Sequence, residues 1–256
     1  MTPDIHHANV RVAMVTGGSR GLGRALTLDL LAAGWQVVTD GRDAEALIRL
    51  REQTANPDRL VTLPGDVADP DHRAALIGEL ARFGGLDLLV NNASLLGPSG
   101  ETGPTEQESP DAGLGLSALA EYAIAGLAEV YAVNLLAPLA LIQLALPHLE
   151  RRSGRIVNVS SDAAVEPYEG WGGYGSSKAA LDQLTNVLAA EHPGLRIYAF
   201  DPGDMRTDMH SQAFPGEDIS DRPEPESVVP ALTGLIDGDL PSARYRASAL
   251  LPQTTL

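Results

Sequence analysis

Short β-branched runs alternate along the chain with stretches in which apolar residues recur at helical spacing. The first run, Val10 to Thr16, ends at Gly17, and apolar residues then recur every three or four positions from Leu22 to Ala33. Further strands are predicted at 36–39, 60–63, 86–90, 155–160, 195–200 and 243–247, and further helices at 43–51, 72–83, 176–191 and 227–236. This alternation predicts an α/β fold, with a doubly wound parallel sheet of about seven strands and helices on both faces.

Three stretches depart from this pattern. Residues 116–149 form an apolar helical region that Pro138 and Pro147 interrupt, and no apolar run is expected to approach the roughly 18–20 residues of a membrane span. Residues 97–115 are acidic and rich in Gly and Pro, which fits either a surface insertion or a lid over an active site. Residues 210–225 are a second loop dominated by Pro and acidic residues.

Composition narrows the class of protein. The 256 residues show no domain boundary and predict a single domain. A formal net charge of −16 disfavours binding to nucleic acid or to anionic membranes. The absence of Cys and of signal-peptide features at the N-terminus favours a cytoplasmic protein. The six His show no metal-ligand spacing, so no metal site is expected.

A glycine-rich turn joins the first predicted strand to the first predicted helix. Its sequence, Thr16-Gly-Gly-Ser-Arg-Gly-Leu-Gly23, has the spacing Gly-x-x-x-Gly-x-Gly. Glycines at such a turn let the backbone approach a pyrophosphate, whose charge the helix N-terminus stabilises. The turn is therefore a candidate dinucleotide-binding site.

Tyr174 and Lys178 lie four residues apart at the start of a predicted helix, so both side chains project from the same helix face. A cation beside a phenol favours the phenolate, which predicts a lowered Tyr174 pKa and a general acid or base. Lys178 is the single Lys among 18 basic residues. Because the chain otherwise uses Arg, a compact ammonium here indicates a specific role.

Together these motifs resemble the short-chain dehydrogenase/reductase family, in the branch with TGxxxGxG and YxxxK. The resemblance runs from about Val10 to Ala247 and includes Asn91-Asn92-Ala93-Ser94, where Ser94 replaces the family's Gly. It implies a Rossmann-like domain and a catalytic tetrad in which Tyr174 is the general acid/base. The tetrad residues would be Asn134, Ser161, Tyr174 and Lys178, with Ser161 thirteen residues before the tyrosine and preferred over Ser160.

The resemblance also implies a role for each tetrad member. Lys178 would lower the Tyr174 pKa and hold the nicotinamide ribose, Ser161 would bond the substrate oxygen, and Asn134 would position a water. The residues implied for cofactor binding are Thr16, Gly17, Ser19, Arg20, Gly21, Leu22, Gly23, Gly41, Arg42, Asp66, Val67, Asn92, Ala93, Ser94, Tyr174, Lys178, Pro202, Gly203 and Thr207.

The choice between NADP(H) and NAD(H) depends on the end of the second strand. An acidic residue there binds the ribose of NAD, whereas cations bind the 2′-phosphate of NADP. The discriminating position is Gly41, flanked by Arg42 and near Arg20, which favours NADP(H). Asp40, one position earlier, would favour NAD(H) if its carboxylate pointed at the ribose.

The resulting prediction is an NADP(H)-dependent oxidoreductase that reduces a ketone or aldehyde, or oxidises the alcohol. An epimerase or dehydratase of the same family that retains its cofactor is an alternative, as is a non-catalytic NADP(H) sensor, which the complete tetrad disfavours. The segment 166–171 either lines the substrate pocket or packs the loop, and 210–225 occupies the position of the family's substrate lid. The helices at 116–149 and 176–191 correspond to those through which relatives form dimers and tetramers, or are internal core.

Overall fold

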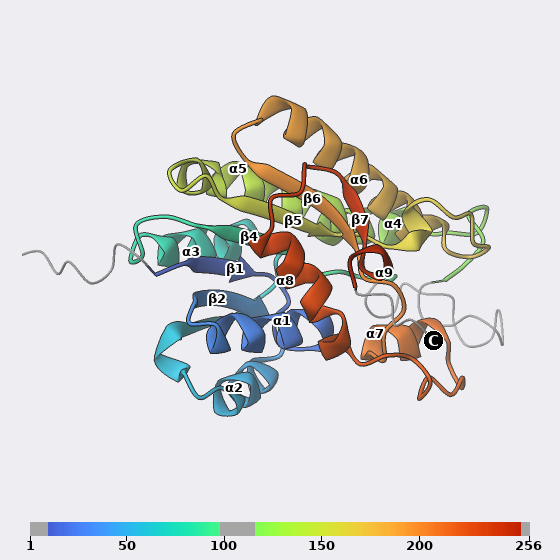
Figure 1. The fold of residues 1–256 in the computed structure, drawn as a ribbon. Coiled ribbons are helices and arrows are strands. Elements are labelled where there is room, and N and C mark those ends of the chain that lie inside the picture. Colours follow the sequence, from blue (N-terminus) through green and yellow to red (C-terminus); the bar gives the residue numbers. More distant parts are fainter. Residues whose placement is uncertain (1–9, 98–115, 252–256) are drawn as a thin grey trace, which may run out of the picture.

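In a computed structural model that describes residues 10–97 and 116–251, seven parallel strands form one sheet (Figure 1). The strands, in the spatial order β3-β2-β1-β4-β5-β6-β7, confirm the predicted doubly wound α/β fold. Their bounds are β1 Val12–Val15, β2 Gln36–Gly41, β3 Leu60–Pro64, β4 Leu88–Asn91, β5 Arg155–Val159, β6 Arg196–Asp201 and β7 Arg244–Arg246.

The strand order reverses between β1 and β4. From β1 the chain runs outward through β2 to β3, and from β4 it runs outward the other way to β7. Val15 is in register with both Thr39 and Val90, so the carboxyl ends of the central strands lie level. In open parallel sheets, ligands bind at the carboxyl ends beside such a reversal.

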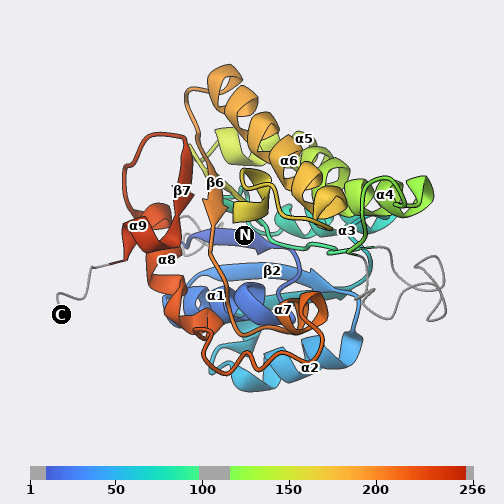
Figure 2. The same ribbon diagram turned by 90° about the vertical axis from the view of Figure 1, so that its right-hand side faces the viewer.

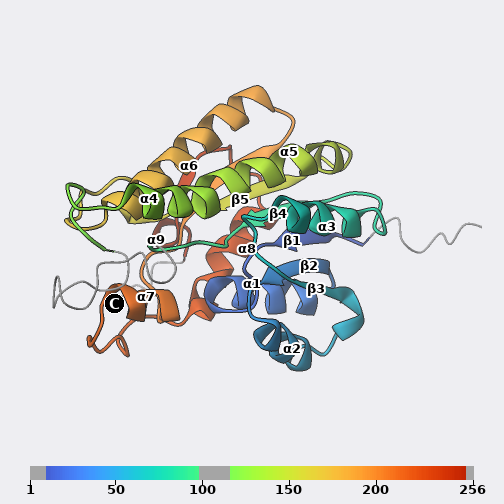
Figure 3. The same ribbon diagram turned by 180° about the vertical axis from the view of Figure 1, so that it is seen from behind.

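Helices cover both faces of the sheet (Figures 1 and 3). One face packs against α1 (Gly21–Ala32), α2 (Ala44–Gln53) and α8 (Val229–Asp237), and the other against α3 (Pro70–Leu80), α5 (Ala137–Glu150) and α6 (Gly172–Glu191). Buried leucines and valines form a separate core on each face. The two short helices α7 (Asp208–Ala213) and α9 (Ala247–Leu250) were not predicted.

The long apolar region differs from its prediction in start and continuity. Helix begins at α4 (Ile124–Tyr131), passes through one π-helical segment at Ala132–Leu136 and continues as α5. Pro138 does not interrupt it, because a proline near the start of α5 follows a segment that already departs from α-helical bonding. Asn134 lies inside the π-helical segment and is fully buried. Segments of this kind often occur at functional sites.

This continuous helix corrects the expectation about apolar length. The helix Ile124–Glu150 has 27 residues, and its most apolar stretch has a mean hydropathy of 1.7. By length and composition alone, it could span a membrane. On one side, Leu141, Ala145 and Leu149 are buried against the sheet, as in a core helix of an α/β fold. On the other, Leu136 and Leu144 are 56% and 44% exposed.

Candidate active site

A cavity of about 450 Å³ opens at the carboxyl ends of the strands, where the strand order reverses. Its walls come from the glycine turn, the ends of β2 to β6, the start of α6 and helix α7. Most of the sequence-predicted site residues line it. The exceptions are Thr16, Gly23 and Asn134, which lie directly behind the cavity wall.

Thr16 and Gly23 shape the glycine turn. The Thr16 Oγ1 accepts hydrogen bonds at 3.0 Å from the backbone N–H groups of both Asn92 and Ala93, which ties the turn to the end of β4. A Cβ on Gly23 would lie 2.4 Å from the Gly17 carbonyl oxygen, so only glycine lets α1 approach the turn this closely. Gly17 itself has a φ of +67°, which favours glycine.

Asp40 lines the cavity beside the turn, but its carboxylate is bonded within the protein. Its side chain is almost fully buried, and Oδ1 accepts the Gly17 backbone N–H at 2.7 Å. The Oδ2 lies 3.1 Å from the His72 Nε2 of α3. Each carboxylate oxygen therefore already has one partner inside the protein, which weakens the argument for a ribose contact by Asp40.

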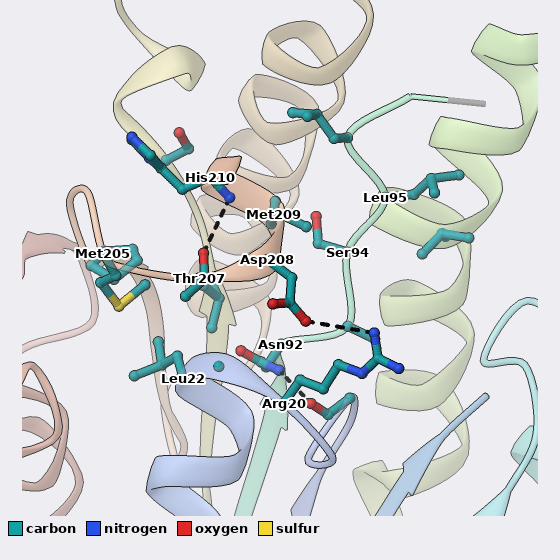
Figure 4. A pocket seen from close by; sticks show the side chains of 18 of the residues that line it. Arg20, Leu22, Asn92, Ser94, Leu95, Met205, Thr207, Asp208, Met209 and His210 are labelled. Carbon is teal, nitrogen blue, oxygen red and sulfur yellow. Dashed lines mark hydrogen bonds and ion pairs between the residues drawn. The ribbon is translucent and has the colours of Figure 1, made fainter. Parts of the chain in front are cut away.

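The end of β2 and the glycine turn meet around Gly41. A Cβ on Gly41 would lie 2.6 Å from the Ser19 Oγ. The Ser19 side chain of the turn therefore leaves no room for a side chain at position 41. Arg20 extends from the turn toward α7, where its guanidinium lies 3.6 Å from Asp208 (Figure 4). The same guanidinium is 2.6 Å from Asp43, while Arg42 also lines the cavity.

Tyr174 and Lys178 occupy the first two turns of α6, which begins four residues earlier than predicted, at Gly172. Both side chains are buried, and the Lys178 Nζ lies 5.6 Å from the centre of the Tyr174 ring. The Nζ donates a hydrogen bond of 2.8 Å to the Val159 carbonyl at the end of β5. The expectation that the two side chains share one helix face thus agrees with the geometry.

The expected lowering of the Tyr174 pKa does not occur in this structure. Burial raises the pKa of Tyr174 to about 12, although hydrogen bonds with Ser161 and Ser94 act to lower it. Burial also lowers the pKa of Lys178 to about 8, against the opposing effect of Asp182. Loss of hydration dominates both shifts, because both groups are enclosed and burial disfavours the charged form of each.

Ser161 follows β5 and caps a short 3-10 helix, where its Oγ accepts the Ala163 N–H at 3.2 Å. The Oγ also donates to the Asp162 carboxylate at 3.0 Å, and its hydrogen bond with Tyr174 brings two predicted tetrad members together. Asp162 lines the cavity and accepts the Tyr168 hydroxyl at 2.9 Å. Asp162 was not predicted, because a single Asp in a loop carries no signal in the sequence.

Asn134 holds the loop that follows β4. Its side-chain amide accepts the Leu95 N–H at 2.8 Å and donates to the Leu95 carbonyl and to the Ser177 Oγ, both at 2.9 Å. Its Oδ1 also accepts the Ser94 hydroxyl at 3.2 Å. The amide is therefore saturated by protein groups, and the expected positioning of a water cannot use it.

Part of the remaining cavity wall is apolar. Trp171 lies there and packs at 5.8 Å between ring centres against both Tyr174 and Phe214. It thus both lines the pocket and packs the loop, two roles that were predicted as alternatives. Thr207 caps α7 by accepting the His210 N–H (Figure 4). His210, Gln212 and Ala213, at the start of the 210–225 segment, line the cavity. Residues 98–115 of the acidic loop lie outside the described residues.

Comparisons with known proteins agree with this geometry. The family model described as short chain dehydrogenase matches residues 11–218. Mouse sepiapterin reductase is 34% identical over 254 residues, which cover 94% of this chain and 90% of that protein. Among solved structures, the KRED1-Pglu enzyme matches with a TM-score of 0.80 at 29% identity, covering 92% of this chain and all of the other. A short chain dehydrogenase from Escherichia coli CFT073 complexed with NADPH matches with a TM-score of 0.80 at 27% identity, covering 93% and 96%.

The matched region contains β1 to β6, the glycine turn and the Tyr174–Lys178 pair. The described fold and the order of the motifs agree with the family model and with the solved structures. The chain therefore belongs to the short-chain dehydrogenase/reductase family of oxidoreductases.

Proposed function

We propose that this protein transfers hydride between NADP(H) and a carbonyl or alcohol substrate, with reduction of a ketone or aldehyde as the favoured direction. The observation that carries the proposal is the convergence of Ser161, Tyr174 and Lys178 with the glycine turn around one cavity. A proton donor and a dinucleotide cradle in the same cavity supply the two parts of a carbonyl reduction.

The residues present fit NADP(H). Gly17 and Gly21 have positive φ values, which shape a turn that a pyrophosphate can approach, and the N-terminus of α1 faces the cavity. The cations Arg20 and Arg42 lie beside Gly41, where an NAD enzyme would place a carboxylate. The E. coli structure complexed with NADPH and the similarity to a sepiapterin reductase support the same cofactor.

The bound cofactor would supply a hydride to the carbonyl carbon, and the protein would supply the proton. Tyr174 donates its hydroxyl proton to the carbonyl oxygen, so the C=O double bond becomes a C–H and an O–H bond. Ser161 would hold the substrate oxygen beside the Tyr174 hydroxyl by turning its Oγ–H from Asp162 to that oxygen. Lys178 faces the forming phenolate and stabilises its negative charge.

The raised pKa of Tyr174 keeps its phenol protonated. With a pKa of about 12 the phenol carries its proton at neutral pH, as a general acid must. Proton return to Tyr174 would pass through a water in the cavity. Asn134 itself positions the Leu95 backbone at the cavity wall.

The substrate is proposed to enter between Trp171 and α7. The wall there includes Leu96, Met209, Ala213 and the Trp171 ring, with the polar side chains of His210 and Gln212 on α7. This mixture suits a carbonyl compound with an apolar substituent. The segment 210–225 would close over this substrate as a lid, because α7 already reaches the cavity.

Three coarser assignments complete the proposal. The chain forms one catalytic domain and acts in the cytoplasm. It assembles as a homodimer or homotetramer, for which Leu136 of the π-helical segment, Leu144 of α5 and Val187 of α6 supply exposed apolar side chains. Sedimentation velocity of the purified protein tests the assembly.

Replacement of Tyr174 by Phe tests the function. The purified enzyme is assayed for NADPH oxidation against a panel of neutral ketones, aldehydes and α-diketones. We expect Tyr174→Phe to lower kcat by at least about 1,000-fold with NADPH affinity within about threefold, because only the proton donor is lost. Tyr245→Phe, which loses a hydroxyl bonded to the Pro241 carbonyl outside the cavity, is the matched control. Turnover by Tyr174→Phe close to that of the wild type would overturn the proposal, and bound cofactor without net NADPH consumption would favour an epimerase or dehydratase.

A further inference from the structure

Arg244 on the edge strand β7 bonds three separate segments that meet behind the cavity. Its Nε donates to the Asp182 Oδ2 at 2.9 Å. Its Nη2 donates at 2.9 Å both to the Ser161 carbonyl oxygen and to the Asp201 Oδ2. Figure 2 shows β7 beside β6, the strand that ends at Asp201.

Each of the three partners belongs to a segment that forms the candidate active site. The Ser161 side chain contacts the Tyr174 hydroxyl. The hydrogen bond from Arg244 to the Ser161 main-chain carbonyl therefore holds in place a residue that touches the proposed proton donor. The Asp201 Oδ1 accepts the Gly203 N–H at 3.0 Å and thereby shapes the Pro202–Gly203 turn at the cavity wall. Asp182 lies one helical turn after Lys178 on the same face of α6.

The charges of this cluster are nearly enclosed. The side chain of Asp201 is 3% exposed and that of Asp182 is 12% exposed, while Arg244 is 23% exposed. Arg246 also contacts the Asp201 Oδ2, at 3.2 Å, but its side chain is 47% exposed and it reaches none of the other partners. Only a planar guanidinium offers donors in several fixed directions at once, which a lysine ammonium on a flexible stem does not.

We propose that Arg244 is a positioning residue for the reaction, which fixes Ser161 and the Pro202–Gly203 turn relative to the helix that carries Tyr174 and Lys178. This inference rests on the proposed function, because it concerns the rate of the same proton and hydride transfer. Arg244 acts through the Ser161 carbonyl and through Asp201, and it does not line the cavity itself.

The test compares Arg244→Gln and Arg244→Lys with Arg196→Gln as a matched control. Arg196 lies at the opposite end of β6, where its guanidinium pairs with Asp239 on the surface. In steady-state assays with NADPH and the best carbonyl of the panel, we expect both Arg244 variants to lose about 10- to 100-fold in kcat. The Kd for NADPH should change by less than about threefold, since the adenosine end of the site is untouched.

Two further readouts separate positioning from a general loss of stability. In Arg244→Ala, added guanidinium chloride below denaturing concentration should restore part of the kcat, whereas sodium chloride at equal ionic strength should not. With NADPH deuterated at the nicotinamide C4, the isotope effect on kcat should rise in Arg244→Gln, because transfer itself becomes slower. Urea unfolding midpoints report stability for each variant.

The outcomes are distinct from a failure of the proposed function. If Tyr174→Phe remains active, the proposed function fails whatever Arg244 does. If Tyr174→Phe is inactive while Arg244→Gln keeps kcat within twofold of the wild type, the positioning role is wrong. The positioning role would also be wrong if Arg196→Gln and Arg244→Gln lost the same fraction of kcat at equal unfolding midpoints. Should Arg244→Gln fail to fold, Arg244→Lys and guanidinium rescue of Arg244→Ala decide the question in the same way.

Discussion

The Asp40 carboxylate accepts the backbone N–H of Gly17 at 2.7 Å, so an acidic side chain at the end of β2 supports the glycine turn. His72 occupies its other oxygen at 3.1 Å. An acidic residue near this position would ordinarily indicate a ribose contact and NAD. Here the carboxylate is buried, and it stabilises the loop that is proposed to bind either dinucleotide.

Asp40→Ala should therefore weaken NADPH and NADH binding by similar factors, about 10-fold each. Removal of the acceptor leaves the Gly17 N–H without its partner, which costs about 1–3 kcal/mol. Fluorescence titration with each cofactor measures both affinities. Asp40→Asn keeps an acceptor oxygen and serves as the control, with a smaller loss. A selective loss of NADH binding in Asp40→Ala would instead show that the carboxylate reaches the ribose.

Arg20 and Arg42 are expected to discriminate between the cofactors. The 2′-phosphate of NADP would bind the Arg20 guanidinium in competition with Asp43, which now lies 2.6 Å from it. We expect micromolar binding of NADPH, with NADH at least about tenfold weaker, because each cation bonds a phosphate that NADH lacks. Arg20→Gln combined with Arg42→Gln should remove most of this difference and leave NADH affinity nearly unchanged. Equal affinities in the unaltered protein would contradict the assignment.

The pH dependence of turnover should follow Lys178 and not Tyr174. For reduction, Tyr174 must be protonated, and with a pKa of about 12 it stays so throughout the ordinary range. Lys178, with a pKa lowered to about 8, loses its charge as the pH rises through that value. Since the charge stabilises the forming phenolate, kcat for reduction should be constant below pH 7 and fall above about pH 8. Stopped-flow rates of NADPH oxidation at saturating substrate measure the profile, and a flat profile to pH 10 would rule out this role of the lysine.

Much of the fold could be predicted from the sequence because its signals are local. The helix predicted at 43–51 begins where it was expected, and the Asp43 Oδ1 caps it by accepting the Ala46 N–H at 3.0 Å. The strands agree to within a few residues, because fully buried parallel strands appear as short, β-branched runs. The four-residue spacing of Tyr174 and Lys178 likewise fixes their common face once a helix forms.

The features that were missed depend on distant contacts. The Arg244 bonds exist because the sheet places β7 beside β6 and β6 beside β5, an order that no local pattern reveals. The orientation of Asp40 depends on His72, thirty-two residues away on α3. The Tyr174 pKa was expected to be lowered, whereas burial raises it. The four-residue spacing to Lys178 reveals the nearby cation but not the burial of the phenol.

Asn134→Leu should uncouple the loop after β4 from the helix. The leucine has a similar shape but leaves the Leu95 N–H and carbonyl without partners, at a cost of about 1–3 kcal/mol for each unsatisfied group. We expect a lower urea midpoint and a kcat loss of at least about tenfold. Asn158→Leu, which removes another fully buried amide bonded to Asn91 and Thr185, is the control for stability. Equal effects of the two variants on kcat would mean that Asn134 has no specific role at the site.

A reversal of cofactor preference at Gly41 should require two substitutions. Gly41→Asp places a carboxylate where NAD enzymes have it, but the new Cβ would lie 2.6 Å from the Ser19 Oγ and 3.1 Å from its Cβ. The single variant should therefore distort the turn and weaken both cofactors. Gly41→Asp with Ser19→Gly removes both contacts, and we expect it to bind NADH more tightly than NADPH, because the carboxylate repels a 2′-phosphate. Fluorescence titrations of the single and double variants, with Ser19→Gly alone as the control, measure the change. Tight NADH binding by Gly41→Asp alone, at an unchanged urea midpoint, would show that the Ser19 side chain moves aside without cost.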